Sequence, residues 1–365
     1  MKETLADSLG LHCPRCRHPG ESALVQWPLR LADVFLRQGE FVLEGFFACA
    51  NARCAARYPI LEGVPIVVKD LAAWTADAPW RPERLPCETR EMRDLLEDAG
   101  AAVPANPGYR RKLAACLDNH YGPASTPGAQ SADGRMPYWE AVERLLRPAT
   151  AEPYARAVDL GCSVGRATFL LGDFSRLAVG LDLDFGAVAR AAAFQRAGVI
   201  RYRRRLGGQR EEEVGSACAP ASNAVFLAAD ALEPPFLAES FDCVAALNML
   251  DSVRAPLTLL GQADALLKPR GHLVLASPYE WREDVCEPAE WLETPELDGA
   301  AVVRGILAGS VVPQMQMRYE LLEELPELTW PFRHHARCWT VFLTHALKAR
   351  KRPPAGDPAP GCGAP

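Results

Sequence analysis

From residue 155 onward, short apolar runs of strand length alternate with segments of helical periodicity. The runs lie at residues 157–160, 178–183, 225–228, 243–248 and 272–277. An apolar strand followed by a helical crossover leads back to a neighbouring parallel strand, so this alternation favours a sheet covered by helices. We therefore predict an α/β fold for residues 151–349, with a Rossmann-like, doubly wound and mainly parallel sheet.

Some segments of the sheet region do not fit this alternation. Residues 201–223 are polar and lie between the second and third predicted strands, so we expect a surface loop there. The pattern is irregular after Ser277 until residues 336–348, which predict a final strand. Residues 350–365 have the composition of a disordered tail.

A cysteine-rich module at residues 1–70 precedes the sheet region. Pro79, Pro82 and Pro86 follow it, and their missing N–H donors disfavour helix and sheet. We predict a linker and helical cap at residues 71–150. Helical periodicity within this part is found at residues 88–99, 109–119 and 138–146. His120, at the end of the second helical segment, is expected to be a helix-end polar residue rather than a base.

Composition and charge exclude some classes of protein. With 365 residues, 49% of them hydrophobic, the chain can build about two domains. Its apolar runs are too short to span a bilayer and its start lacks a signal-peptide pattern, so we expect a cytoplasmic protein without membrane contact. The twelve cysteines are then thiols or metal ligands. The net charge of −6 gives no broad surface for nucleic acid, although a local basic run comprises Arg201, Arg203, Arg204, Arg205 and Arg210.

A glycine-bearing turn follows the first predicted strand, in the segment Ala157-Val-Asp-Leu-Gly-Cys-Ser-Val-Gly-Arg166. Glycines there let the backbone approach a ligand at the carboxyl end of the strand. The spacing of Gly161, Ser163 and Gly165 differs from the Gly-x-Gly-x-x-Gly of dinucleotide sites. Asp159 would also repel a pyrophosphate. The turn therefore predicts a site for a cofactor without phosphate groups.

Carboxylates also end the second and third predicted strands. Asp182 can accept hydrogen bonds from ribose hydroxyls, and Asp230, followed by Ala231, can accept one from an adenine amine. A single Asp after a strand is common in turns. The joint spacing of three acids at three consecutive strand ends is the informative signal.

These motifs together resemble those of class I S-adenosylmethionine (SAM) dependent methyltransferases, over about residues 155–348. The matching segments are Val158-Asp-Leu-Gly-Cys-Ser-Val-Gly165, Gly180-Leu-Asp182, Ala229-Asp230-Ala231, Phe241-Asp242-Cys-Val244 and Leu267-Lys-Pro-Arg-Gly-His-Leu-Val274. Ser163 departs from the glycine that the family often has there. The resemblance implies that Asp159 and the Gly161, Ser163 and Gly165 turn line the methionine part of SAM. It also implies that Asp182 holds the ribose, Asp230 and Ala231 meet the adenine, and Asn248 lies near the transferring methyl.

Two loops after the fourth and fifth strands are expected to build the acceptor pocket. Asn248 and Asp251 lie in the first loop and Tyr279 and Trp281 in the second, and these four are the candidate catalytic residues. The two aromatic rings can flank a planar or cationic acceptor. The alternative is that they pack the loop against the core.

The same loops resemble those of the mercaptohistidine N-methyltransferases of ovothiol biosynthesis. The similar segments are residues 248–251, Ser277-Pro-Tyr-Glu-Trp281, Glu290-Trp291-Leu292 and Gly198-Val-Ile-Arg-Tyr202. This resemblance implies a small-molecule acceptor with an imidazole nitrogen. The sulfoxide-synthase portion of that family has no counterpart here, and Leu292-Glu-Thr replaces the glycines that often follow the tryptophan.

Cys13-Pro-Arg-Cys16 and Cys49-Ala-Asn-Ala-Arg-Cys54 supply two thiolate pairs, a suitable set for tetrahedral zinc. The second pair is more widely spaced than in the usual ribbon, and chance clustering is the alternative. Residues 57–68 resemble the end of the zinc-ribbon activator subunits that partner tRNA, rRNA and release-factor methyltransferases. That resemblance implies a small zinc-ribbon-like β module fused to its catalytic partner.

Three functions remain open from the sequence. The leading hypothesis is a methyltransferase for a small-molecule acceptor. A second is an rRNA or tRNA methyltransferase that uses the zinc module and the basic run. A third is a noncatalytic adaptor that binds the cofactor. Neither the acceptor nor the oligomeric state follows from the sequence.

Overall fold

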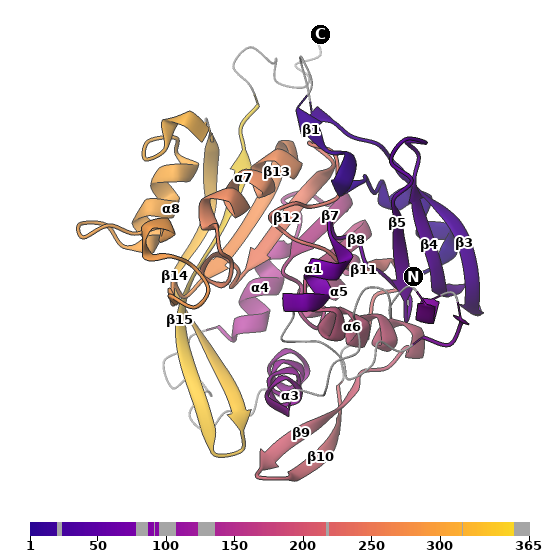
Figure 1. The fold of residues 1–365 in the computed structure, drawn as a ribbon. Coiled ribbons are helices and arrows are strands. Elements are labelled where there is room, and N and C mark those ends of the chain that lie inside the picture. The colour runs from indigo at the N-terminus through magenta and orange to yellow at the C-terminus, as the bar shows by residue number, and fades with distance from the viewer. Residues whose placement is uncertain are drawn as a thin grey trace.

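A seven-stranded sheet forms the centre of the computed structural model, with strand order β11-β8-β7-β12-β13-β15-β14 (Figure 1). The structure describes residues 1–19, 24–77, 87–90, 92–94, 107–122, 136–216, 219–315 and 317–353. The mutually parallel strands are β7 (Tyr154–Leu160), β8 (Ser175–Asp182), β11 (Ala224–Ala228), β12 (Phe241–Leu247) and β13 (Leu267–Ser277). β15 (Cys338–Lys351) runs antiparallel to β13, and β14 (Tyr319–His335) runs antiparallel to β15. The predicted Rossmann-like, mainly parallel sheet is confirmed.

Helices cover both faces of this sheet because successive side chains of a strand point to opposite faces. Ala157, Ala178 and Cys243 pack on the face of α4 (Tyr138–Leu146) and α5 (Arg166–Asp173). The neighbouring residues Val158, Val179 and Val244 pack on the opposite face, with α7 (Pro256–Leu266) and α8 (Gly299–Leu307). α6 (Phe185–Ala197) connects β8 to β11. No helix among the described residues is long and apolar enough to cross a membrane.

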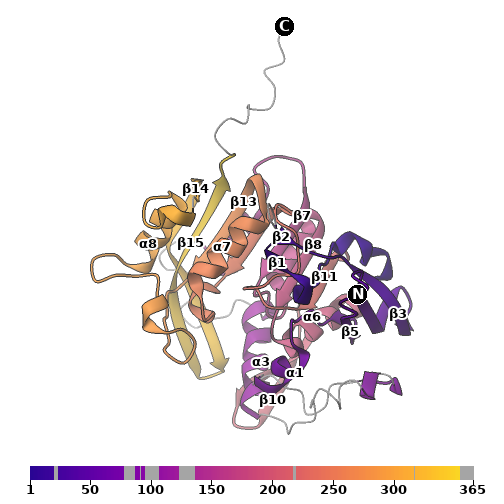
Figure 2. The same ribbon diagram turned by 45° about the horizontal axis from the view of Figure 1, so that its top comes forward.

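The N-terminal module is a four-stranded antiparallel sheet beside the β11 edge (Figures 1 and 2). Its strands are β3 (Leu29–Gln38), β4 (Phe41–Cys49), β5 (Arg57–Leu61) and β6 (Val64–Pro65), with a short β1 (His18–Pro19) and β2 (Leu24–Val25) pair. Just beyond β6, Ile66 bridges Ala228 in parallel, and the Val67 amide donates to the Ala228 carbonyl at 2.8 Å. Leu9 and Leu11 of the module belong to the same apolar core as Leu160 of β7. The module therefore extends the central sheet and shares its core.

The polar segment at residues 201–223 is not a loop throughout, so that prediction was wrong. β9 (Arg201–Gly207) and β10 (Arg210–Gly215) form an antiparallel hairpin. Arg203, Arg204 and Arg205 stand opposite Glu213, Glu212 and Glu211. Cross-strand pairing of opposite charges supports this hairpin, and its strands carry few apolar residues, which is why a search for apolar alternation misses it.

The region after Ser277 is also more regular than its sequence indicates. It contains α8, where the Asp298 side chain caps the helix by accepting from the Ala301 amide at 2.7 Å. It also contains β14, whose apolar alternation is interrupted by Pro326 and Pro331. β15 confirms the final strand and continues to Lys351, inside the predicted tail, while residues 354–365 lie outside the described residues.

The predicted helices at residues 109–119 and 138–146 are confirmed by α3 (Pro107–Tyr121) and α4. A further helix, α1 (Leu71–Asp77), follows the module. Of the predicted helix at 88–99, residues 91 and 95–99 lie outside the described residues, as do residues 78–86 of the linker. The division into domains stays a prediction.

Candidate cofactor and acceptor site

The carboxyl ends of β7 and β12 meet where the strand order reverses, which is where open α/β sheets bind ligands. The turn after β7 has positive φ angles of +76° at Gly161, +49° at Ser163 and +87° at Gly165. A Cβ on Gly161 would lie 2.2 Å from the sulfur of Met249, and one on Gly165 would lie 2.6 Å from the ring of Phe226. Both glycines are therefore required, and the turn contacts the loop after β12 through Met249.

Asp182 connects this turn to the end of β8. Its carboxylate accepts from the Ser163 amide at 2.8 Å and from the Asp184 amide at 2.9 Å. Burial raises the pKa of Asp182 above its ordinary value, although these backbone bonds oppose the rise. The residue predicted to hold a ribose thus also shapes the turn.

Two more carboxylates lie close to Asp182. Asp159 is 1% exposed beneath the turn and accepts from the Thr168 hydroxyl at 2.8 Å. Burial raises its pKa to about 7, and the charge of Asp182 adds to the rise. Burial, with the charge of Asp182, likewise raises the pKa of Asp184 to about 6. Acids that repel one another in this way favour a cationic ligand.

Asp230 and Ala231 follow β11 at the same edge of the sheet. The Asp230 carboxylate accepts from the Leu232 amide at 2.8 Å and pairs with Arg254 at 3.2 Å. Ala231 is buried. Sequence reasoning missed Arg254, which reaches Asp230 from the segment after β12.

The two predicted acceptor loops lie side by side. The Glu280 amide donates to the buried Asp251 carboxylate at 2.9 Å, and the Asn248 amide donates to the Ala276 carbonyl at 2.7 Å. The side chain of Asn248, at a φ of +52°, donates to the Tyr138 hydroxyl at 2.9 Å. Its buried Oδ1 has no hydrogen-bond partner among the described residues. An orphaned acceptor at this edge is suited to a ligand that donates a hydrogen bond.

The two aromatic residues of the second loop have different surroundings. Trp281 stacks on Trp291, with ring centroids 6.4 Å apart, and donates to Glu293 at 3.0 Å. Those contacts agree with the alternative that Trp281 packs its loop against the core. The Tyr279 hydroxyl lies 2.8 Å from Nδ1 of His345, a residue that sequence reasoning did not select.

α3 lies across the cofactor turn. The Tyr121 hydroxyl donates to the Val164 carbonyl at 2.6 Å, and the Tyr109 hydroxyl donates to Asp184 at 2.6 Å. His120 is neutral at physiological pH, because burial lowers its pKa to about 3. This agrees with a structural role for His120 rather than that of a base.

Asp118 of α3 anchors the helix to the β9–β10 hairpin and to a second hairpin, which β14 and β15 form. It binds Arg204 of β9 at 2.8 Å and Arg333 of β14 at 2.5 Å, and the Tyr202 hydroxyl donates to it at 2.9 Å. Figure 1 shows α3 between the two hairpins. We refer to Asp118, Tyr202, Arg204 and Arg333 as the Asp118 cluster.

Residues 158–275, which carry the turn and the acids, match the family model described as methyltransferase domain. The chain contains a class I SAM-dependent methyltransferase domain. The predicted cofactor residues, which run from Asp159 to Asn248, all lie within the matched segment. The match supports SAM-dependent methyltransferase activity and leaves the acceptor open.

Solved structures are similar to this chain at low identity. YcgJ from Bacillus subtilis is 14% identical, with 59% of this chain and 99% of that chain covered and a TM-score of 0.39. NodS, an N-methyltransferase from Bradyrhizobium japonicum, is 16% identical, with 59% and 96% covered and a TM-score of 0.34. A 16S rRNA adenine methyltransferase from Catenulisporales acidiphilia is 18% identical, with 60% and 93% covered and a TM-score of 0.38. No curated protein matches the chain.

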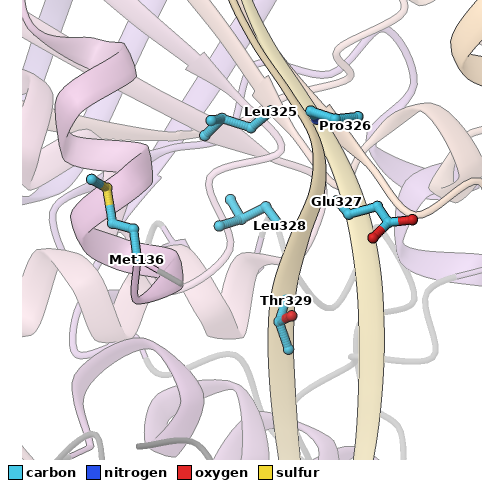
Figure 3. Close-up of a pocket in the computed structure, with 6 residues that line it drawn as sticks. All are labelled: Met136, Leu325, Pro326, Glu327, Leu328 and Thr329. Carbon is cyan, nitrogen blue, oxygen red and sulfur yellow. The ribbon is translucent and has the colours of Figure 1, made fainter. Parts of the chain in front are cut away.

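Two cavities lie outside the cofactor turn of the methyltransferase domain. One, of about 360 Å³, lies between Met136 and residues 325–329 of β14 (Figure 3). The other, of about 420 Å³, is lined by residues that include Glu44, Glu62 and Arg93. Neither is lined by a predicted cofactor or acceptor residue.

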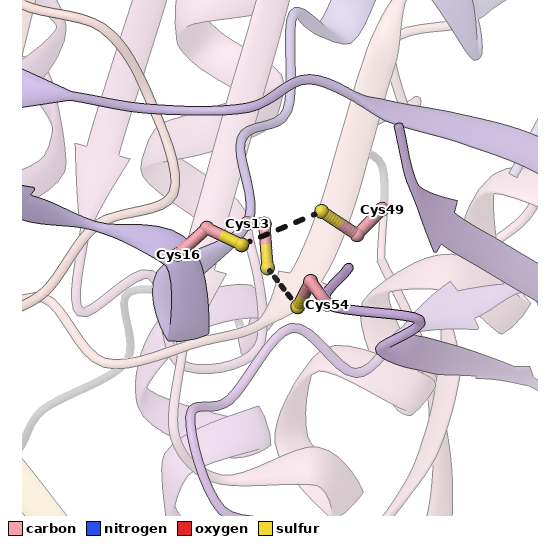
Figure 4. Close-up of side chains that lie close together, drawn as sticks. All are labelled: Cys13, Cys16, Cys49 and Cys54. Carbon is pink, nitrogen blue, oxygen red and sulfur yellow. Dashed lines mark hydrogen bonds between the residues drawn. The ribbon is translucent and has the colours of Figure 1, made fainter. Parts of the chain in front are cut away.

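The four cysteines of the module converge from both halves of its sequence (Figure 4). The sulfurs of Cys13 and Cys54 are 3.9 Å apart, those of Cys16 and Cys49 are 3.7 Å apart, and all four lie within 4.8 Å of one another. A tetrahedral zinc with Zn–S bonds of about 2.3 Å separates its sulfurs by about 3.8 Å. The cluster therefore has the dimensions of a zinc site, despite the wide spacing of the second pair.

Proposed function

We propose that this protein transfers the methyl group of SAM to a small-molecule acceptor, with an imidazole-type nitrogen as the first candidate. The group of neighbouring carboxylates at the cofactor turn, of which Asp159 is buried, carries this proposal. SAM brings a sulfonium and an ammonium group, and both offset the repulsion between Asp159, Asp182 and Asp184.

In this proposal the strand ends bind successive parts of the cofactor. Asp159 and the Gly161–Gly165 turn face its methionine part, Asp182 holds the ribose, and Asp230 with Ala231 meets the adenine. Asn248 lies nearest the methyl group, where its unpartnered Oδ1 accepts from the ligand. Methyl transfer is an in-line displacement, so these residues chiefly orient the reactants and exclude water.

The acceptor is proposed to lie between the loops of Asn248 and Tyr279, with Asp251 joining the loops and Trp281 supporting them from behind. The charges of the β9–β10 hairpin favour a small molecule over RNA. Arg203 and Arg204 pair with Glu211 and Glu212 at 3.8 and 3.0 Å, so two of the five arginines of the basic run have a carboxylate partner. A phosphate-binding surface requires free positive charge.

Zinc is proposed to be held by Cys13, Cys16, Cys49 and Cys54. A four-thiolate site leaves no open coordination position, so this zinc would stabilise the module and take no part in methyl transfer. Thiolate ligands persist in a reducing compartment, which supports a cytoplasmic location.

The first test is calorimetric titration of the purified protein with SAM, S-adenosylhomocysteine and NAD. We expect binding of the two adenosyl ligands and none of NAD. Asp182→Ala should weaken SAM binding by roughly 2–4 kcal/mol, because a charged acceptor is lost. Asp242→Ala is the matched control, since Asp242 binds Lys268 and the Arg156 amide at the opposite end of β12.

Turnover assays with different acceptors then distinguish the three hypotheses for the function. Mercaptohistidine and histidine are offered as acceptors beside total ribosomal RNA, at low and high salt. Methylation of an imidazole supports the proposal. Methylation of RNA, with binding that weakens steeply in salt, would establish the second hypothesis. Tight SAM binding without any turnover would favour the adaptor.

A further inference from the structure

A chain of hydrogen bonds begins at Tyr279 and leads away from the proposed acceptor site. The Tyr279 hydroxyl lies 2.8 Å from Nδ1 of His345, and Nε2 of His345 lies 2.8 Å from a carboxylate oxygen of Glu324. The Tyr279 and His345 rings stack, with centroids 5.9 Å apart and an angle of 26°. The three residues come from the loop after β13, from β15 and from β14. Arg304 of α8 also binds Glu324, at 2.8 Å.

The chemistry of the three groups fixes the direction of this chain. Burial raises the pKa of Glu324, but hydrogen bonds from Arg304 and His345 outweigh that effect and leave the pKa below its ordinary value. Glu324 is therefore a carboxylate, which can only accept, so Nε2 of His345 carries a hydrogen. Burial also lowers the pKa of His345, so the ring is neutral and Nδ1 is free to accept from the Tyr279 hydroxyl.

The groups that face His345 come from several elements. Glu324 and Asp298 favour its protonated form, Arg304 opposes it, and Tyr279 is uncharged because burial raises its pKa. The imidazole thus has two acids beside it that can stabilise a positive charge formed during a reaction. It is only 5% exposed, so water competes little with these contacts.

Tyr279 is held in an unusual conformation at the edge of the acceptor site. Its φ is +56°, a left-handed backbone conformation that is rare for a large side chain. A Cβ on Gly299 would lie 2.5 Å from its ring, so the glycine makes room for this placement. The backbone amide of the next residue, Glu280, donates to the Asp251 carboxylate and so ties Tyr279 to the Asn248 loop.

We propose that Tyr279, His345 and Glu324 form a proton relay that takes the proton of the methyl acceptor as it is methylated. This inference rests on the proposed methyltransferase function. The acceptor lone pair forms the new bond to the methyl carbon while the carbon–sulfur bond breaks, and its electron pair stays on sulfur. The proton of the acceptor passes to the Tyr279 oxygen, and the Tyr279 hydroxyl hydrogen passes to Nδ1 of His345. The resulting imidazolium is stabilised by Glu324.

A second buried tyrosine–histidine pair provides a matched control. The Tyr154 hydroxyl lies 3.1 Å from Nδ1 of His272, near the amino end of β7. Here Lys348 and Arg350 face the imidazole, and its Nε2 has no hydrogen-bond partner in the part of the chain that the structure describes. Burial, with these cations, lowers the pKa of His272 to about 4. Among the residues that the structure describes, no carboxylate binds this imidazole as a relay would need.

The kinetic test compares Tyr279→Phe, His345→Asn and Glu324→Gln with Tyr154→Phe. With mercaptohistidine as the acceptor, each relay variant should lower kcat by roughly 100-fold or more, the usual contribution of general base catalysis. SAM affinity, measured by calorimetry, should stay within about 2-fold, because none of these residues is assigned to the cofactor. The acid limb of the kcat profile should move to lower pH in Glu324→Gln, since loss of the carboxylate lowers the pKa of His345. Tyr154→Phe should keep the kcat of the wild type, and relay variants that match this control in kcat and pH profile would overturn the relay.

Nitrogen-15 NMR of the imidazoles tests the proposed relay in the absence of any methyl acceptor. The relay requires His345 to carry its hydrogen on Nε2 and to accept at Nδ1 at neutral pH, and Tyr279→Phe should shift only the Nδ1 signal. The other tautomer, or an imidazolium, overturns the proposal. A failure of the proposed function itself would show separately, as absent SAM binding in the wild-type protein.

Discussion

Two regions flank the methyltransferase sheet, and they are attached by different interactions. The N-terminal module shares an apolar core with the sheet and continues it through the Ile66–Ala228 bridge. α3 also has apolar contacts, through Leu117 and Tyr121, but it is fixed over the cofactor turn in addition by tyrosine hydroxyls and by the buried charges of the Asp118 cluster. Apolar burial depends little on direction, whereas each buried charge needs its own partner. We therefore expect the module to tolerate changes of pH and single polar substitutions that disturb α3.

Removal of zinc from the module should have the largest effect. In zinc-finger peptides the metal contributes about 10–16 kcal/mol to folding, and the shared apolar core should reduce the loss here to roughly 5 kcal/mol or more. We expect Cys13→Ser and chelator to lower the thermal midpoint strongly and to abolish zinc in elemental analysis. Cys338→Ser, at an exposed cysteine of β15, is the control. A zinc-free protein with an unchanged midpoint would show that the apolar core alone holds the module.

Asp118→Asn should have the next largest effect. The side chains of Arg204 and Arg333 are only 12% and 10% exposed, and the substitution removes the buried carboxylate that both contact, which leaves Arg204 with the exposed Glu212. Breaking a buried pair in this way costs roughly 3–5 kcal/mol, measured here by urea unfolding. Glu212→Gln removes a partner of the same Arg204, but Glu212 is 45% exposed, so a loss of less than about 1 kcal/mol is expected. Equal losses in the two variants would contradict the distinction between buried and surface charge.

The difference between apolar burial and specific polar contacts also explains which features the sequence predicts well. The turn after β7 depends on neighbouring residues, because Gly161 and Gly165 adopt positive φ angles that favour glycine. Apolar strands such as β8 and β12 can also be recognised from their own short runs of sequence. The sheet and the cofactor turn can therefore be predicted from the amino-acid sequence alone.

The relay and the Asp118 cluster depend instead on contacts between distant residues. Tyr279 and His345 are 66 positions apart and meet because β15 runs antiparallel to β13, which places His345 opposite Ser277. Arg333 is 215 positions from Asp118. No local periodicity records such pairings, so the sequence could not identify His345 or Glu324 as site residues.

A pH titration should sharpen the comparison further. The pKa of Asp159, about 7 in the folded protein, lies above its ordinary value of 3.8, so the folded state binds more protons between these pH values. The free energy of unfolding without ligand should therefore fall as the pH rises from about 4 to 7, by up to about 4 kcal/mol. SAM should recover this loss, because its cationic groups favour the ionised carboxylate.

The measurement is the thermal midpoint with and without SAM from pH 5 to 8. The shift caused by SAM should grow with pH and level off above about 7, while zinc content stays constant. Asp159→Asn keeps an acceptor for the Thr168 hydroxyl and should flatten the dependence. A shift by SAM that is independent of pH in the wild type would remove Asp159 from the cofactor site.

Tyr121→Phe should have the smallest effect and isolates the contact between α3 and the cofactor turn. It removes only the hydroxyl that donates to the Val164 carbonyl, while the ring keeps its edge contact with Phe194. Loss of one buried hydrogen bond costs about 1 kcal/mol, or roughly 5-fold in the Kd for SAM if α3 shapes the bound turn. Tyr319→Phe removes a similar hydroxyl, which donates to Asp264 at 2.7 Å on α7, and should lower stability without changing the Kd. If both variants bind SAM equally well, α3 covers the turn without shaping it, and the two flanking regions differ in their attachment but not in their influence on the cofactor.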